Sequence, residues 1–328
     1  MSGPAFRLIN EFQRDFPLCR APFEAIARRL GASESWVLEM LQAYRAQGVV
    51  SRVGAVFAPR SIGASVLAAL AVPQADLEHV AERVGSHPEV NHNYEREHRY
   101  NLWFVATASS EEKLRAALRR IESEAGCGRM LVLPLIEEYR IDLGFDLRSD
   151  RGAPVLASTP RAVPLGEPEK RLVLNLQPGL ALVNRPFAAL ADAAGWAEQE
   201  AMTIIEHWIA AGVIRRFGVI LRHHELGYRA NAMAAWDVPD SLVSVLGLRL
   251  AQQQGVTLCY RRERALPDWP YNLFCMIHGR GREAVSRRLR ELRIDSGLAV
   301  FPSQVLFSRR RFKQHGARYF SAAEVAHV

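Results

Sequence analysis

A stretch rich in histidine, tyrosine and arginine, at residues 91–104, holds the side chains best suited to chemistry. It reads Asn-His-Asn-Tyr-Glu-Arg-Glu-His-Arg-Tyr-Asn-Leu-Trp-Phe. Because strand residues alternate between two faces, His92, Tyr94 and Arg96 should share one face, with His98 as a further candidate. The other face should carry Asn91, Asn93, Glu95 and Glu97. A guanidinium binds carboxylates and an imidazole transfers protons near neutral pH. This pattern predicts a site for an anion that undergoes proton transfer; the alternative is a solvated strand edge.

A second, diverged version of this motif lies at residues 258–274. Four residue types recur in it: Tyr260, Arg262, Tyr271 and Asn272 correspond to Tyr94, Arg96, Tyr100 and Asn101 of the first version. Leu258 replaces His92, and a longer loop with Trp269 replaces the turn that carries His98. We therefore expect one version to hold the acid chemistry while the other mainly binds the substrate.

The two motifs belong to a duplication that covers nearly the whole chain. The segment 20–23 returns at 184–187, and the segment 47–54 returns at 211–218. Between the copies, residues 148–170 are rich in proline, glycine and serine, which is typical of a linker.

Each copy shows three helical patterns followed by a βαββαβ pattern. In the first copy the helices fall between Leu8 and Gly48, with Ser33 as the expected N-cap of the third. A strand pair over residues 49–57 would form a wing. Strands are then predicted at 66–72, 90–97, 100–106 and 130–139, with helices at 75–85 and 110–125.

These patterns predict an α+β protein, a tandem repeat of a winged helix-turn-helix and a ferredoxin-like domain with helices on one face of an antiparallel sheet. The expected domains are a first winged helix-turn-helix at 1–60, a first ferredoxin-like domain at 61–147, the linker at 148–170, a second winged helix-turn-helix at 171–224 and a second ferredoxin-like domain at 225–328.

Composition limits the classes of partner and compartment. The 328 residues carry a net charge of +7, and only three of the 42 basic residues are lysines, so an anionic partner fits. The four cysteines form no CxxC pair, which argues against a zinc ribbon or a disulfide framework and suits a reducing cytoplasm. No apolar run approaches the roughly 20 residues of a membrane span.

The domain order resembles that of the Lrp/AsnC family of bacterial regulators, whose sheet domains pair to build an effector site. The resemblance implies that the two sheet domains pair with each other or with those of another chain. Specific DNA binding is not expected, because the candidate recognition helices at 33–40 and 196–206 carry two and three carboxylates and no Arg or Lys. Arg52, Arg215 and Arg216 would reach only phosphate, which carries no sequence information.

Several motifs also resemble the two subunits of siroheme decarboxylases, joined in one chain. They are His-Asn-Tyr-Glu-Arg and Tyr-Asn-Leu-Trp-Phe in the first half, with Cys-Tyr-Arg-Arg, Pro-Asp-Trp-Pro-Tyr-Asn-Leu-Phe and Met-Ile-His-Gly in the second. This resemblance implies removal of CO₂ from the acetate arms at C12 and C18 of siroheme. The product, 12,18-didecarboxysiroheme, would serve the synthesis of heme d1 or an alternative heme route.

Siroheme is an iron tetrapyrrole with eight carboxylates, and the resemblance gives roles to these side chains. The expected catalytic residues are His92, His98, Arg96 and Tyr94, with His223 as a further proton donor. The expected carboxylate-binding residues are Arg96, Arg215, Arg216, Arg222, Arg261 and Arg262. The remaining substrate contacts are expected from Tyr100, Asn101, Trp103, Tyr260, Trp269 and Tyr271. The iron would belong to the substrate, so no cofactor is expected.

Two other functions stay open at this point. One is an Lrp/AsnC-type regulator that senses a heme or an amino acid, and the other is a tetrapyrrole carrier without catalysis. The two halves should form an internal pseudo-heterodimer. Free edges of the sheets would favour association of two such chains as a homodimer.

Overall fold

The computed structural model describes residues 3–141, 144 and 163–325. The chain divides into two units, and each copy contributes to both. The helical unit comprises residues 1–63, 160–226 and 316–328, and the sheet unit comprises residues 64–159 and 227–315. The C-terminal segment from Gly316 therefore belongs to the helical unit, whereas we expected it in the second ferredoxin-like domain. Most of the expected linker lies outside the described residues, and a helix begins at Glu167 within its last part.

The helical unit contains the three expected helices of each copy. In the first copy they are α1 (Pro4–Glu11), α2 (Pro22–Leu30) and α3 (Glu34–Ala46), and in the second α6 (Glu167–Leu176), α7 (Pro186–Ala194) and α8 (Glu198–Ala210). The side chain of Ser33 accepts a hydrogen bond from the Trp36 amide at 3.1 Å, which confirms the predicted N-cap. A short 3₁₀ helix, η1 (His223–Leu226), and α11 (Ala322–Val325) complete the unit.

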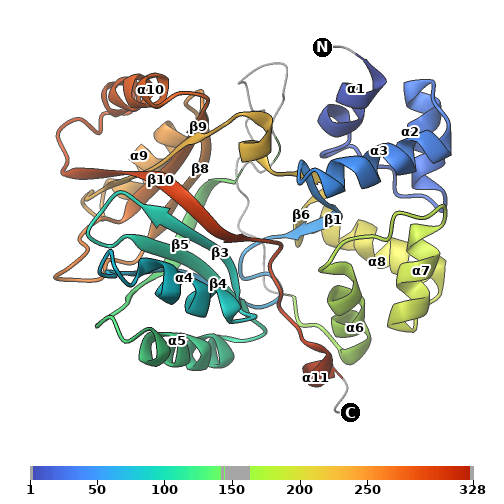
Figure 1. Ribbon diagram of the computed structural model, residues 1–328, viewed down its shortest axis with the longest axis horizontal. Helices are drawn as coiled ribbons and strands as arrows, with labels where there is room; N and C mark the ends of the chain where they lie inside the picture. Colours follow the sequence, from blue (N-terminus) through green and yellow to red (C-terminus); the bar gives the residue numbers. More distant parts are fainter. Residues whose placement is uncertain (1–2, 142–143, 145–162, 326–328) are drawn as a thin grey trace. The chain divides into compact units, whose positions relative to one another are not determined.

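The expected wing is wrong, because each copy supplies one strand instead of a strand pair. β1 (Val50–Phe57) pairs antiparallel with β6 (Ile214–Leu221) of the other copy. The register places Gly54 opposite Gly218, at equivalent positions of the two copies. This two-stranded ribbon therefore joins the copies through an internal twofold relationship (Figure 1).

The sheet unit confirms the βαββαβ order twice. The first copy runs β2 (Ala64–Leu70), α4 (Leu77–Ser86), β3 (Val90–Arg96), β4 (Leu102–Ala108), α5 (Glu111–Ala125) and β5 (Leu131–Ile141). The second runs β7 (Ala230–Trp236), α9 (Val243–Ala251), β8 (Val256–Arg262), β9 (Leu273–Gly279), α10 (Arg282–Asp295) and β10 (Ser303–Gln314).

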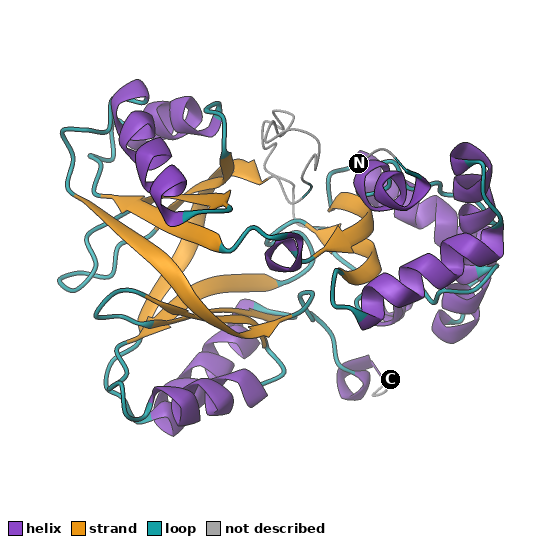
Figure 2. Ribbon diagram, turned by 45° about the horizontal axis from the view of Figure 1, so that its top comes forward, coloured by secondary structure: helices purple, strands orange, loops and turns teal. Residues whose placement is uncertain are grey.

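The two sheets close into one eight-stranded barrel because their last strands are long enough to cross between them. The first part of β5 pairs with β2 of its own sheet, and the part from Leu135 onward pairs with β8. Likewise β10 pairs first with β7 and, from Ser308, with β3 (Figures 1 and 2). The halves therefore pair with each other within one chain. Each of these eight strands has two neighbours, so the sheet edges that we expected to favour a homodimer are absent from the described barrel.

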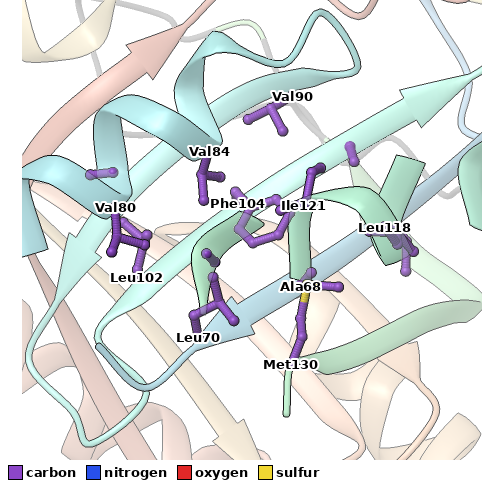
Figure 3. Close-up of a cluster of buried hydrophobic side chains, with 14 of the residues drawn as sticks. Ala68, Leu70, Val80, Val84, Val90, Leu102, Phe104, Leu118, Ile121 and Met130 are labelled. Atoms are coloured by element: carbon purple, nitrogen blue, oxygen red, sulfur yellow. The ribbon is translucent and has the colours of Figure 1, made fainter. Parts of the chain in front are cut away.

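Strand alternation separates an outer core from an inner one. In the first copy, side chains such as Phe104, Val84 and Ile121 fill the layer between the sheet and helices α4 and α5 (Figure 3). A matching layer lies under α9 and α10. The opposite faces of both sheets enclose a third cluster, the barrel interior, which contains Leu67, Trp103, Leu133, Met233, Tyr260, Trp269, Phe274, Met276 and Leu306.

Candidate functional site

The predicted alternation along residues 91–96 places one set of side chains on the interior face of β3. His92 is in register with Val105, and Tyr94 is in register with Trp103; both partners belong to the barrel interior or pack against it. The ring of His92 meets that of Tyr94 edge-on, with centroids 6.2 Å apart. His92, Tyr94 and Arg96 therefore share the face that the sequence predicted.

The other set of side chains points to the outer layer and stabilises it. Asn93 donates to the carbonyl of Ala81 on α4 at 2.9 Å, and Asn91 donates to the Thr107 hydroxyl at 3.1 Å. Glu95 accepts a hydrogen bond from Arg310 at 2.6 Å. These contacts account for the outer set and leave the chemistry to the inner one.

Arg96 brings a positive charge into the barrel interior without a matching negative one. The residue is only 8% exposed. Its Nη1 donates to the Leu306 carbonyl at 3.3 Å, its Nη2 lies 3.9 Å from the sulfur of Met276, and its guanidinium lies 5.9 Å from the Tyr94 ring centroid. Burial lowers the pKa of Arg96, while the phenol groups of Tyr94 and Tyr260 oppose that shift. Among the described residues no carboxylate lies within ion-pairing distance, so a ligand carboxylate would supply the counter-charge.

Arg262 occupies the equivalent position in the second copy. Its Nη1 donates to the Leu133 carbonyl at 2.8 Å, and its guanidinium lies 4.6 Å from the Tyr260 ring centroid. The neighbouring Arg261 points to the outer face and bonds Asp240 Oδ1 at 3.0 Å. The structure therefore removes Arg261 from the interior set that we expected to bind carboxylates, because successive strand residues face opposite ways.

An aromatic cluster surrounds Trp269, which is fully buried. Its ring centroid lies 5.1 Å from that of Trp103, 5.0 Å from Tyr271 and 5.4 Å from His98. The Trp103 indole donates to the Tyr100 carbonyl at 2.7 Å. Four of the expected substrate contacts (Tyr100, Trp103, Trp269 and Tyr271) are thus gathered in one apolar wall of the kind that a macrocycle can pack against.

His98 lies in the turn after β3, so it does not continue the interior face of the strand. Its Nδ1 accepts a hydrogen bond from the Tyr100 amide at 3.0 Å, so that nitrogen carries no proton. Burial and the nearby Arg99 both lower the pKa of His98. Neutral His98, with its proton on Nε2, is a weaker proton donor than an imidazolium would be.

Asn101, an expected substrate contact, bonds the neighbouring backbone in this structure. Its amide accepts from the Val72 N–H at 2.9 Å and donates to the Val72 carbonyl at 2.8 Å. Asn272 makes the same pair of contacts with Val238, at 3.0 and 2.9 Å. Since both ends of the Asn101 amide are occupied, we leave Asn101 out of the binding set.

Two further polar residues of the sheet unit lie near the interior: His278, which belongs to the Met-Ile-His-Gly motif and received no role from the sequence, and Glu138, which the sequence analysis missed. His278 alternates on β9 with the interior residues Met276 and Phe274, and its Nδ1 lies 3.0 Å from the Thr257 hydroxyl. Glu138 is a buried carboxylate on β5 in register with Tyr260. The position of His278, two residues after the apolar strand residue Met276, indicates that its side chain shares the interior face. The location of Glu138 could not be predicted without knowing that β5 crosses to the second sheet.

Four expected substrate contacts belong to the helical unit, while the barrel interior is built from the sheet unit. Arg216 is buried, with Nη1 3.4 Å from Gln13 Oε1, and Arg215 is partly buried. Arg222 Nη1 lies 3.4 Å from the Gly48 carbonyl. His223 begins η1, and its side chain lies outside the described part of the structure.

The helices that would read DNA have their first turns engaged by the other copy. Glu34 of α3 accepts a hydrogen bond from Asn184 at 2.6 Å. At the equivalent position of α8, Glu198 pairs with Arg185 and lies 3.8 Å from Arg20 of the first copy. These contacts occupy the helix ends that a helix-turn-helix inserts into the major groove.

Two general properties concern metals and membranes. Within the described ranges, no three His, Cys, Asp or Glu side chains are grouped so as to hold a metal ion. No helix among the same residues is long and apolar enough to cross a membrane.

Comparison with known proteins gives the same assignment for both parts of each copy. The chain matches the AsnC-like ligand binding domain over residues 62–140 and 225–313. It matches the siroheme decarboxylase NirDL-like HTH domain over residues 6–50 and 169–215. It is 44% identical over 323 residues to the siroheme decarboxylase NirDL subunit of Paracoccus denitrificans, which covers 98% of this chain and 97% of the relative.

Solved structures agree along the whole length. The crystal structure of the siroheme decarboxylase NirDL superposes with a TM-score of 0.72 at 29% identity, covering 99% of this chain and 96% of that one. A second crystal structure shows NirDL in complex with an iron-uroporphyrin III analogue, with a TM-score of 0.71 at 29% identity and coverage of 98% and 95%. The chain belongs to the siroheme decarboxylase family, in the NirDL form that carries both domains twice.

Proposed function

We propose that this protein is a carboxy-lyase that removes CO₂ from the C12 and C18 acetate arms of siroheme and releases 12,18-didecarboxysiroheme. The observation that carries the proposal is the pair of buried guanidinium groups, Arg96 and Arg262, inside a barrel with an aromatic wall. Guanidinium groups bind carboxylates through paired charge-assisted hydrogen bonds, and the indole and phenol rings suit the faces of a tetrapyrrole. Membership of the siroheme decarboxylase family supports the same substrate.

The chemistry balances with one proton per arm. The bond between the acetate methylene carbon and the carboxylate breaks, CO₂ leaves, and the electron pair stays on the methylene carbon, where the conjugated ring delocalises it. One proton then completes the methyl group. The reaction consumes no oxidant or reductant, so in this proposal the protein needs no cofactor and the iron enters with the substrate.

His92 is the preferred proton donor. It lies on the interior face of β3 beside Tyr94, and Arg96 follows four residues later on the same face. His98 is less suited because its Nδ1 accepts the Tyr100 amide and its pKa is lowered. Arg96 would orient the carboxylate that leaves, and Tyr94 would line the site next to it.

The proposed roles of the helical-unit residues rest on residue type and number. Arg215, Arg216 and Arg222 would bind further carboxylates of the substrate, with His223 as a reserve proton donor. Their type and number suit a ligand of eight carboxylates.

Anaerobic turnover tests the proposal. Purified protein is incubated with siroheme and the pigment is followed by mass spectrometry. We expect two successive losses of CO₂. Unchanged pigment that stays bound would indicate a carrier, whereas unchanged pigment together with a ligand-dependent shift in DNA mobility would indicate the regulator.

Three broader assignments accompany this proposal. The four cysteines are free thiols, which supports a cytoplasmic location. The product would enter the synthesis of heme d1 or an alternative heme route. Association of two copies as a homodimer stays a prediction, which sedimentation would test. Free sheet edges no longer support it, because the barrel is closed.

A further inference from the structure

The barrel interior contains the same arginine twice, related by the internal twofold of the sheet unit. The amide of Arg96 donates to the Asn101 carbonyl, and the amide of Arg262 donates to the Asn272 carbonyl, both at 2.8 Å. The guanidinium groups of Arg96 and Arg262 donate to the backbone carbonyls of Leu306 and Leu133, which are equivalent positions of the two copies. Leu133 is in register with Leu67 on β2, and Leu306 with Met233 on β7.

The surroundings of the two guanidinium groups differ, although their anchoring is the same. Arg96 reaches the thioether of Met276 and influences His278 electrostatically. Arg262 lies closer to its own tyrosine than Arg96 does, 4.6 Å against 5.9 Å to the ring centroid. The interior therefore offers two guanidinium groups with equivalent backbone anchoring and different neighbours, among them the buried carboxylate of Glu138 in register with Tyr260.

The reactive half of siroheme has a matching symmetry. Rings C and D carry their side chains in mirrored order, with an acetate at C12, propionates at C13 and C17, and an acetate at C18. A twofold axis in the plane of the macrocycle, through C5 and C15, therefore exchanges the two acetate arms that are lost. The half of the ligand that has this axis matches a barrel with an internal twofold when the two axes coincide.

We propose that one bound orientation of siroheme places one acetate arm at Arg96 and the other at Arg262, so that each arginine orients the carboxylate lost at one ring position. After CO₂ leaves, His92 supplies the proton to the arm at Arg96, and solvent water supplies it to the arm at Arg262, where Leu258 stands in place of His92. The proposal rests on the proposed function and adds the assignment of two arms to two positions. The alternative is a single position that serves both arms, which requires the monodecarboxylated pigment to leave and bind again after turning over.

Paired variants distinguish these two schemes. Arg96→Gln and Arg262→Gln each remove one positive charge and keep a shorter, polar side chain that can still form hydrogen bonds. Arg115→Gln, on the exposed face of α5, is the matched control. Each protein is incubated anaerobically with siroheme, and the two monodecarboxylated isomers are separated by chromatography and identified by nuclear magnetic resonance after removal of the iron.

We expect the two interior variants to accumulate opposite isomers. Each should slow the loss of CO₂ from one arm about tenfold or more, while the other arm stays within about threefold of the unmodified protein. Accumulation of the same isomer by both variants, or an unchanged isomer ratio in both, would overturn the proposal.

Two further measurements keep the result decisive. Circular dichroism and urea unfolding identify a variant that does not fold, and in that case Arg96→Lys and Arg262→Lys are compared by the same isomer ratio and the same criterion. If the unmodified protein forms neither isomer, the proposed function fails. If it forms both products and the variants do not separate the arms, only this inference fails.

Discussion

The Nδ1 atom of His278 lies 3.0 Å from the hydroxyl oxygen of Thr257, and the same hydroxyl lies 3.0 Å from the Met276 carbonyl. These contacts join Thr257 of β8 to the part of β9 that carries the imidazole. Burial, and then the charge of Arg96, lower the pKa of His278 to about 4.

The depressed pKa of His278 predicts a loss of stability in acid. Between the unfolded value of about 6.5 and the folded value of about 4, the unfolded chain binds a proton that the folded chain does not, so the free energy of unfolding falls as the pH falls through this window. Across this window His278 lowers the free energy of unfolding by at most about 3 kcal/mol, and His278→Gln should abolish this part of the pH dependence. Urea unfolding at several pH values measures the slope. An equal slope in His278→Gln and in the exposed-site control His224→Gln would contradict the prediction.

Replacing the two candidate histidines should separate a proton donor from a structural residue. We expect His92→Ala to slow decarboxylation about 10²- to 10⁴-fold, the usual contribution of a positioned acid, while pigment binding stays within a few-fold. His98→Ala should slow it less than about tenfold, because the neutral ring mainly accepts the Tyr100 amide. Single-turnover rates and the binding of siroheme are measured separately. Full activity in both variants would remove the assignment.

Local sequence patterns predicted the elements well but not their long-range pairing. The alternation along residues 91–97 identified the interior side chains of β3, because the strand period depends only on neighbours in sequence. The closed barrel depends on β5 and β10 crossing to the opposite sheet, and pairing between distant strands leaves no mark at either strand alone. The same reason explains the incorrect wing, since β1 finds its partner in β6 of the other copy.

The candidate site was recognised by residue type, which fails where polar side chains serve the backbone. The pair Tyr100-Asn101 returns as Tyr271-Asn272 in the second copy, and this repetition fits a binding residue and a structural one equally well. The contacts with Val72 decide for the structural role. Arg261 and Arg262 are likewise indistinguishable by type, and only the strand register separates the outer arginine from the inner one.

Asn101 and Asn272 should therefore affect stability more than chemistry. Asn101→Ala removes two hydrogen bonds and leaves the Val72 amide and carbonyl without partners, at a cost of about 1–3 kcal/mol. Asn272→Ala should cost less, because the Val238 amide loses its partner while the Val238 carbonyl keeps the hydrogen bond from Arg264 at 2.7 Å. Asn175→Ala, which removes one exposed contact with the Arg171 carbonyl, is the control and should be nearly neutral. Urea midpoints report the differences. A stable Asn101→Ala variant that fails to bind siroheme would restore the residue to the binding set.

The helix-turn-helix modules should not recognise a DNA sequence. The first turn of α3 carries Glu34 bound to Asn184, and that of α8 carries Glu198 bound to Arg185, so entry into a major groove would break these contacts and bring carboxylates toward phosphates. The net charge of +7 still permits weak, salt-sensitive association with any duplex. Mobility shifts with genomic fragments at low salt and at about 0.15 M salt, where charges are screened over roughly 8 Å, separate the two behaviours. Complexes that disappear at the higher salt for every fragment are expected. One fragment that stays bound against excess competitor would show a regulatory site that these helix ends do not provide by themselves.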